Sequence, residues 1–275
     1  MKTVSFFTEK GGEGKTTLSV LFASWLAYCQ KERVQVLDFD HPTFQFSQMR
    51  NNDLNLYSNP ANRVLIREAS RVSPYPVNKI HGKNGYSLVE LNSMVKSLKE
   101  QKEKLGNGYL VLDFPGRFLP SDPAYHLMVN GAVDLVVYLV DSDRQSRAAV
   151  VTVNSVLNPM GQHRQDVIAL WNREHRDERT QVKKGKKDIY EVGNGMLRAL
   201  GIPVISRKMR DILIARRDSD TFGFIRSTIC WPEANIKAKC PYIYDIFSEV
   251  KSRLDGNWED KPFVDYEDGE KEVDE

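Results

Sequence analysis

The sequence predicts an α/β fold in which a doubly wound, mostly parallel sheet is flanked by helices. Short apolar runs typical of buried strands alternate with segments whose apolar residues recur at helical spacing. Several of these runs end in Asp or Asn, and a glycine-rich loop follows the first one. The 275 residues suffice for one large domain or, less readily, for two small ones. No apolar run reaches the ~20 residues that a membrane-spanning helix needs.

The glycine-rich loop lies between the apolar run at 3–7 and the apolar-periodic run at 18–26. From residue 9 to residue 17 it reads Glu-Lys-Gly-Gly-Glu-Gly-Lys-Thr-Thr. The order strand, glycine-rich loop, helix is the setting of a phosphate-binding loop (P-loop), where backbone N–H groups and the helix dipole bind an anion. Lys15 is expected to reach the β- and γ-phosphates, and the Thr16 hydroxyl to hold Mg²⁺. The expected nucleotide-binding residues of the loop are Gly11, Gly12, Glu13, Gly14, Lys15, Thr16 and Thr17. The structural alternative is a β–α turn with solvated lysines.

A second lysine distinguishes this loop from the plain P-loop pattern. That pattern would place its first glycine at position 9, where this chain has Glu9, and Lys10 comes directly before the glycines. The arrangement resembles the deviant Walker A motif of the ParA/MinD family of dimeric ATPases, which are P-loop NTPases of the SIMIBI type. The resemblance implies ATP and Mg²⁺ as cofactors and a homodimer that forms on ATP binding. The resemblance also implies that, in this homodimer, Lys10 reaches the phosphates bound by the partner and acts with Lys15 as a catalytic residue.

Two carboxylates end the apolar run at 34–40. In a parallel sheet the carboxyl ends of the strands face the ligand, so Asp38 and Asp40 are expected near the phosphates. The segment resembles the second motif of the same family, although His41 stands before Pro42. The resemblance implies that Asp40 positions the attacking water and that Asp38 supports the Mg²⁺ shell. Capping of the following helix is the structural alternative for both acids.

Two further strand ends carry candidate site residues. The run at 109–113 ends in Asp113 and continues as Phe-Pro-Gly, which resembles a Walker B motif whose aspartate holds Mg²⁺ through water. The run at 167–171 is followed by Asn172, where the family has an Asn that hydrogen-bonds adenine. Asn is also a common turn residue, so a purely structural role is the alternative for Asn172.

The remaining segments predict the rest of the α/β pattern. Helices are expected at 87–105, at 144–157, up to residue 200 and at 242–254, and strands at 134–140 and 202–205. Loops with one short helix at 63–71 are expected between residues 51 and 83, because Asn, Asp, Ser and Pro punctuate that stretch. The charged run at 173–187 is expected to be a surface loop.

Charge is distributed unevenly along the chain. The net charge is +2, but residues 255–275 hold ten acidic residues and two lysines, which leaves +10 on residues 1–254. We therefore expect a P-loop ATPase domain at 1–254 and an acidic, disordered tail at 255–275. A basic body suggests a polyanionic partner, and a merely solvated surface is the alternative. The basic residues after 205 resemble the segment with which ParA proteins bind the DNA backbone, and they are Arg207, Lys208, Arg210, Arg216 and Arg217.

Together these observations predict a ParA-like ATPase that segregates or positions a plasmid, a chromosome or a conjugative element. It would bind nonspecific DNA as an ATP-dependent dimer, and a centromere-binding or cargo adaptor protein would stimulate its slow hydrolysis. The acidic tail argues against membrane binding, so the expected location is cytoplasmic, with nucleoid association in the ATP state. The alternatives are a MinD-like or conjugation-associated ATPase that positions a protein cargo, or a metabolic enzyme of the same fold. No C-x-x-C pair occurs, which argues against a metal-cluster protein.

Overall fold

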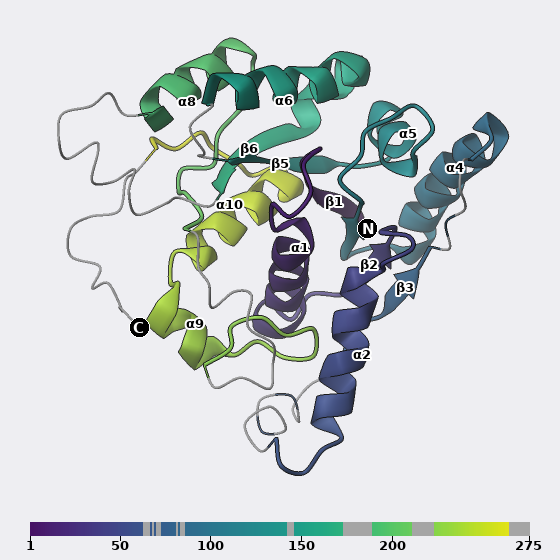
Figure 1. Ribbon diagram of the computed structural model, residues 1–275, viewed down its shortest axis with the longest axis vertical. Helices are drawn as coiled ribbons and strands as arrows, with labels where there is room; N and C mark the ends of the chain where they lie inside the picture. The colour runs from purple at the N-terminus through teal and green to yellow at the C-terminus, as the bar shows by residue number, and fades with distance from the viewer. Residues whose placement is uncertain are drawn as a thin grey trace.

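The computed structural model (Figure 1) describes residues 1–62, 67, 69, 73–80, 82, 86–141, 146–172, 189–210 and 223–263. Within these residues the strands form one six-stranded sheet in the order β3-β2-β4-β1-β5-β6. Every described strand pairing is parallel, which confirms the predicted fold class. The strands are β1 (Lys2–Phe7), β2 (Val34–Asp38), β3 (Val77–Lys79), β4 (Tyr109–Asp113), β5 (Leu135–Asp141) and β6 (Val167–Asn172).

Helices cover both faces of the sheet (Figure 1). One face carries α1 (Lys15–Ser24), which continues as a π-helical turn (Trp25–Cys29), together with α2 (Gln45–Tyr57), α9 (Glu233–Lys239) and α10 (Ile243–Asp255). The other face carries α4 (Leu88–Leu105), α5 (Pro123–Val129), α6 (Ser146–Met160), which a 3₁₀ turn (Gly161–Asp166) follows, and α8 (Ile189–Ala199). The sheet is therefore the middle layer of three.

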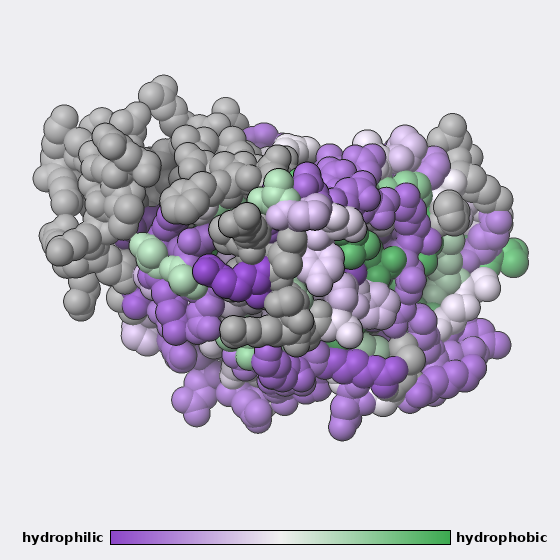
Figure 2. Space-filling view, turned by 90° about the horizontal axis from the view of Figure 1, so that it is seen from below, coloured by the Kyte–Doolittle hydropathy of each residue, from purple (hydrophilic) through white to green (hydrophobic). Residues whose placement is uncertain are grey.

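The strand sequences explain this layered core. Along β4, Tyr109 and Val111 join the core cluster under α1, whereas Leu110 and Leu112 join the cluster under α5 and α6. A strand buried on both faces reads as a continuous apolar run, because successive side chains point to opposite faces. In the face seen from below, hydrophobic residues show only in small groups among hydrophilic ones (Figure 2).

Several predicted elements are confirmed and two are corrected. The 87–105 helix is present, and Ser87 caps it in a reciprocal capping box with Glu90. The segment 51–53, expected as loop, lies inside α2, because Phe46, Arg50 and Asp53 recur at helical spacing and are buried. The expected strand at 202–205 contributes only one isolated bridge, between Ala169 and Val204. The expected helix at 63–71, apart from residues 67 and 69, and the loop at 173–187 lie largely outside the described residues.

The chain continues in contact with the domain beyond residue 254. Asp255 is the last residue of α10, and its carboxylate accepts hydrogen bonds from Lys2 at 2.7 Å and from the Tyr109 hydroxyl at 2.8 Å. Farther on, Trp258 and Phe263 pack against the two core clusters. The described part of the predicted tail, up to residue 263, therefore lies on the body of the protein, and residues 264–275 are outside the described ranges.

Candidate nucleotide-binding site

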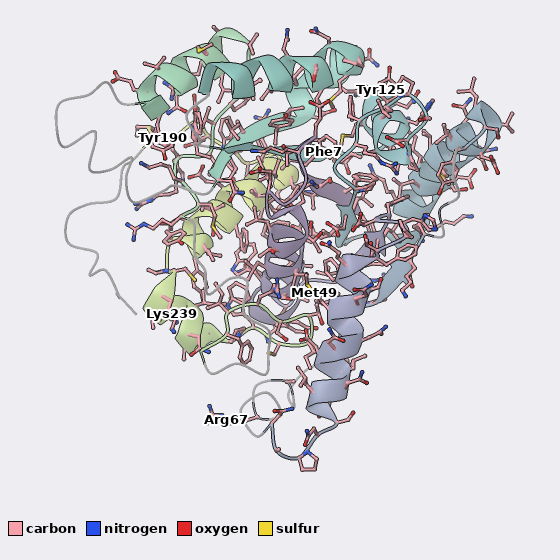
Figure 3. The ribbon with its side chains drawn as sticks, in the orientation of Figure 1. Phe7, Met49, Arg67, Tyr125, Tyr190 and Lys239 are labelled. Atoms are coloured by element: carbon pink, nitrogen blue, oxygen red, sulfur yellow. The ribbon has the colours of Figure 1, made fainter. Side chains whose placement is uncertain are left out.

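The order of the sheet reverses at β1. The chain leaves β1 toward β2 on one side of the sheet, and it leaves the adjacent strand β4 toward β5 on the other side, so these two connections diverge at the carboxyl ends of β1 and β4. Such a switch point is where parallel α/β sheets bind ligands. The glycine-rich loop begins directly after Phe7, the last residue of β1, which is labelled in Figure 3. The fold thus places the predicted phosphate-binding loop at the ligand-binding edge.

The loop backbone is shaped around a concave space. Gly12 and Gly14 have φ of 78° and 82°, a left-handed conformation that favours glycine. Gly14 is the N-cap of α1, and no side chain caps this helix, which leaves its first turn suited to an anion. Residues 11–17 line a cavity of about 280 Å³ together with Asp40, Gln45 and residues 114–116.

Lys15 lies inside this loop. Its ammonium donates a hydrogen bond of 2.8 Å to the backbone oxygen of Lys10, and the side chain is buried. Burial lowers the pKa of Lys15 below its ordinary value, while nearby carboxylates, chiefly that of Asp113, oppose the shift. A Cβ on Gly116 would approach the Lys15 ammonium to 2.8 Å, so the backbone after β4 packs directly on this lysine.

Lys10 is placed differently from Lys15. Its side chain is 64% exposed, and its ammonium lies 3.1 Å from Oε1 of Glu13, whose side chain is only 4% exposed. The two lysines of the motif therefore present one ammonium buried in the loop and one near its surface.

Asp113 has the chemistry of a magnesium ligand. Its Oδ1 accepts a hydrogen bond from Ser19 at 3.2 Å and the carboxylate also bonds Thr16, whereas its buried Oδ2 has no hydrogen-bond partner in the described structure. Burial and the charge of Asp38 raise the pKa of Asp113 to about 7. A buried carboxylate oxygen without a partner beside a Thr hydroxyl fits a hard divalent cation.

Mg²⁺ held here would rely on phosphate oxygens for further ligands. Within the described ranges, no three acidic, His or Cys side chains gather closely enough to hold a metal by themselves. That is the usual situation for Mg²⁺, which few carboxylates and the substrate phosphates bind together. Thr16 and Asp113 are the residues that would hold it.

The structure separates the two carboxylates of the 34–40 segment. Asp38 is fully buried: its Oδ2 accepts hydrogen bonds from the Ser47 N–H at 2.9 Å and hydroxyl at 2.7 Å, and its Oδ1 accepts one from the Asp40 N–H at 3.1 Å. Asp38 thus binds the first turn of α2, as the capping alternative expects. Burial raises its pKa. Asp40 instead lines the phosphate cavity.

Asn172 supports the loop from the end of β6. Its side-chain N–H₂ donates a hydrogen bond of 2.6 Å to the backbone oxygen of Glu13, and the residue is buried. The same nitrogen lies 3.7 Å from the position that a Cβ on Gly14 would take. Asn172 therefore lies beside the loop as expected, and its contact with adenine stays a prediction.

The basic segment after residue 205 is only partly exposed. Lys208 is 2% exposed, and its ammonium lies 4.0 Å from the ring centre of Tyr190, which is labelled in Figure 3. Lys208 is thus removed from the DNA-binding set, because aromatic rings cover its charge. Arg207 pairs with Asp245 at 3.5 Å, and Arg210 lies 5.6 Å from the Tyr242 ring centre.

Arg216 and Arg217, the other two basic residues proposed for DNA, lie outside the described residues.

Three contributors to the site were missed from the sequence: Ser19, Ser47 and Gly116. Ser19 follows Lys15 by one helical turn, so helical spacing would have directed it to the same side of α1. Ser47 binds Asp38 from the first turn of α2, a helix whose position and bounds were not predicted from the sequence. Gly116 was visible only as part of the Phe-Pro-Gly sequence after Asp113.

A glycine-rich loop at the switch point of a parallel sheet, with a buried lysine and a carboxylate on the neighbouring strand, defines a P-loop nucleotide-binding protein. Sequence comparison makes the assignment more specific. The family model described as the CobQ/CobB/MinD/ParA nucleotide binding domain matches residues 4–209, so the chain belongs to this family. No curated protein matches the chain in sequence.

Solved structures share the fold at low sequence identity. A chain of the MinC:MinD cell division protein complex of Aquifex aeolicus is similar over 97% of this chain and 100% of that chain, with a TM-score of 0.61 and 15% identity. Apo McdA of Cyanthece is similar over 92% of this chain and 99% of that one, with a TM-score of 0.55 and 17% identity. A putative plasmid partition protein of Borrelia burgdorferi B31 bound to AMPPNP is similar over 91% of this chain and 98% of that chain, with a TM-score of 0.53 and 12% identity.

Proposed function

We propose that the protein is a ParA-like ATPase switch. Two ATP-bound copies join as a sandwich homodimer, the dimer binds DNA without sequence preference, and slow hydrolysis separates the copies. The observation that carries this proposal is the placement of Lys10, whose side chain is 64% exposed while Lys15 is buried in the same loop. Lys15 serves the phosphates of the protein's own nucleotide. An exposed ammonium beside it suits the phosphates of a nucleotide bound by a second copy.

Each residue of the site would have a separate role in ATP hydrolysis. Mg²⁺ at Thr16 and Asp113 would neutralise charge on the phosphate oxygens. Lys15 and Lys10 would stabilise the charge on the transferring phosphoryl group, which is the main contribution of protein side chains in this reaction. Asp40 lines the phosphate cavity and would orient the attacking water. Asp38 would hold the Asp40 backbone and the first turn of α2 in place, because its carboxylate accepts hydrogen bonds from the Asp40 N–H and from the Ser47 hydroxyl.

DNA binding would follow from dimerisation. Each copy contributes a weak basic surface, and joining two copies makes the DNA affinity conditional on ATP. Arg207, Arg210, Arg216 and Arg217 remain the proposed contacts, since planar guanidinium groups bind phosphate oxygens without reading sequence. A centromere-binding or cargo adaptor protein would stimulate hydrolysis and so set the lifetime of the dimer on the nucleoid. Among the helices that the structure describes, none combines the length and apolar composition needed to span a bilayer.

A gel-shift assay on random-sequence duplex DNA tests the proposal. With Mg²⁺ present, a shift is expected with ATP but not with ADP, and higher salt should weaken it. Lys10→Ala should abolish the shift and Arg207→Ala should weaken it. Lys237→Ala, which removes a similarly exposed cation from α9, serves as the control and should leave the shift unchanged. No shift with any nucleotide, despite ATP binding, would overturn DNA binding and turn attention to a protein cargo.

One observation favours a second candidate, a metabolic enzyme of the same fold. A larger cavity of about 590 Å³ adjoins the phosphate cavity and shares Asp40, Pro115 and Gly116 with it. Its lining adds polar groups of His41 and Arg117. An acceptor for the phosphoryl group would fit beside the γ-phosphate. A dependence of phosphate release on small-molecule carboxylates or amines, in the absence of DNA, would favour this candidate.

A further inference from the structure

The phosphate-binding loop carries a carboxylate of its own. Glu13 lies between Gly12 and Gly14, and its side chain is 4% exposed. Its Oε1 lies 3.1 Å from the ammonium of Lys10, and its charge also acts on buried Lys15. A negative charge at this place repels a triphosphate unless a cation neutralises it. Lys10 supplies such a cation beside Glu13, and Lys10 is also the residue that the proposed dimer needs at the phosphates of a second copy.

The pair has one fixed end and one movable end. The backbone oxygen of Glu13 accepts a hydrogen bond of 2.6 Å from Asn172, and the side chain is buried, so Glu13 is held against β6. Lys10 is mostly exposed and has a long, flexible side chain. Rearrangement of the pair therefore consists of the movement of Lys10 away from Glu13.

We propose that Glu13 is an internal counter-ion that holds Lys10 in its own loop and thereby raises the protein concentration at which ATP-bound copies form the dimer. This rests on the proposed function, in which Lys10 crosses to the phosphates of a second copy. A residue that pairs with Lys10 in the monomer stabilises the monomer and shifts the equilibrium away from the dimer. The nucleotide must then compete with Glu13 for Lys10, so Glu13 is a positioning residue for the motif's second lysine.

The pairing of Glu13 with Lys10 also affects ATP binding by the monomer. If Lys10 neutralises Glu13, its removal takes this counter-ion away from the Glu13 carboxylate beside the phosphates. Lys10→Ala should then weaken ATP binding about fivefold, and adding Glu13→Gln should restore it. The ATP affinity of the monomer is measured by titration with a fluorescent ATP analogue and Mg²⁺, at protein concentrations far below those at which a dimer forms.

The dimer arm uses the same variants with AMPPNP, which prevents turnover. In sedimentation equilibrium, Glu13→Gln should lower the dimer dissociation constant about tenfold, and it should have no such effect in the Lys10→Ala background. The difference between wild type and Glu13→Gln should shrink at high salt, because salt screens the exposed end of the pair. Glu9→Gln is the matched control: it removes the same charge from the same loop, but from a carboxylate that accepts a hydrogen bond from Ser155 at 2.9 Å.

The two arms distinguish this proposal from the proposed function. A wild-type dimer that Glu13→Gln leaves unchanged or weakens would overturn the counter-ion role, as would an equal gain from Glu9→Gln. If the wild type forms no dimer with any nucleotide, the proposed function fails, and the monomer arm decides the pairing alone. Restoration of ATP affinity by Glu13→Gln in the Lys10→Ala protein then supports the internal counter-ion, and no restoration overturns it.

Discussion

Two of the regions that bury charged side chains in this protein bond them in opposite ways. Between α2 and residues 223–230, Arg50 donates hydrogen bonds to Thr228 Oγ1 at 3.1 Å, to the Thr228 backbone oxygen at 2.7 Å and to the Tyr75 backbone oxygen. Asp53 accepts hydrogen bonds from the backbone and side chain of the same Thr228, both at 2.6 Å. At the nucleotide edge, by contrast, Oδ2 of Asp113 is buried and has no hydrogen-bond partner among the residues that the structure describes.

The difference separates structural charges from charges that await a ligand. Buried polar groups in folded proteins are nearly always hydrogen-bonded, so groups matched by the protein hold segments together. A buried carboxylate oxygen that the protein does not match marks the place where a cation belongs. Helix α2 joins the two regions, since Asp38 binds Ser47 in its first turn and Arg50 lies one turn later.

The largest expected effect lies in the matched region. Arg50→Met removes a guanidinium that makes three hydrogen bonds, so the buried oxygens of Thr228 and Tyr75 lose that donor. We expect the free energy of unfolding to fall by about 3–5 kcal/mol, measured by urea denaturation without nucleotide. Lys96→Met, on the exposed face of α4, should change it by less than about 0.5 kcal/mol. Equal stability of Arg50→Met and wild type would show that the network is dispensable.

Replacement of the buried lysine of the phosphate loop by Met should have the opposite effects: it should weaken ATP binding and leave the stability of the fold unchanged. Lys15→Met should lower the affinity for ATP by at least about 100-fold, because the proposed role of its buried ammonium is to bind the phosphates. It should not lower the free energy of unfolding, since burial disfavours the charged amine, as its lowered pKa indicates. Isothermal titration calorimetry and urea denaturation give the two quantities. A large loss of stability would place Lys15 with the structural charges.

A smaller effect concerns pH. The pKa of Asp113 is raised to about 7 in the folded protein, from an ordinary value of 3.8. The folded state therefore retains a proton that the unfolded state has lost, and without nucleotide the free energy of unfolding should fall as pH rises from about 4 to about 7.

Asp113→Asn should remove this contribution. We expect it to flatten the decline by about 2 kcal/mol between pH 5 and pH 8, and to weaken Mg²⁺-dependent nucleotide binding. Denaturation series at several pH values measure the first effect, and titrations with and without Mg²⁺ the second. Parallel pH profiles for the variant and wild type would contradict the unmatched state of this carboxylate.

What could be predicted from the sequence follows the same division. The phosphate loop and the strand-end acids lie in short contiguous motifs, and adjacent parallel strands pair Asp38 with Asp113 in register. The second region depends on contacts between distant segments: Asp53 and Thr228 are 175 residues apart. The Asn and Asp residues at 51–53 favour a loop locally, but this segment is helical because one face of α2 is buried against the rest of the protein. The burial of Lys208 could not be predicted from its own segment either, because the ring that covers its ammonium belongs to Tyr190 of α8.

The central claim is that ATP, held at this edge with Mg²⁺, joins two copies of the protein through Lys10. Sedimentation velocity with Mg²⁺ and ATP, ADP or no nucleotide tests it most directly. The account predicts a species of twice the monomer mass with ATP alone, and only monomer for Lys10→Ala under the same conditions. A wild-type protein that binds ATP yet sediments as a monomer at every concentration, or a Lys10→Ala protein that dimerises like wild type, would contradict it.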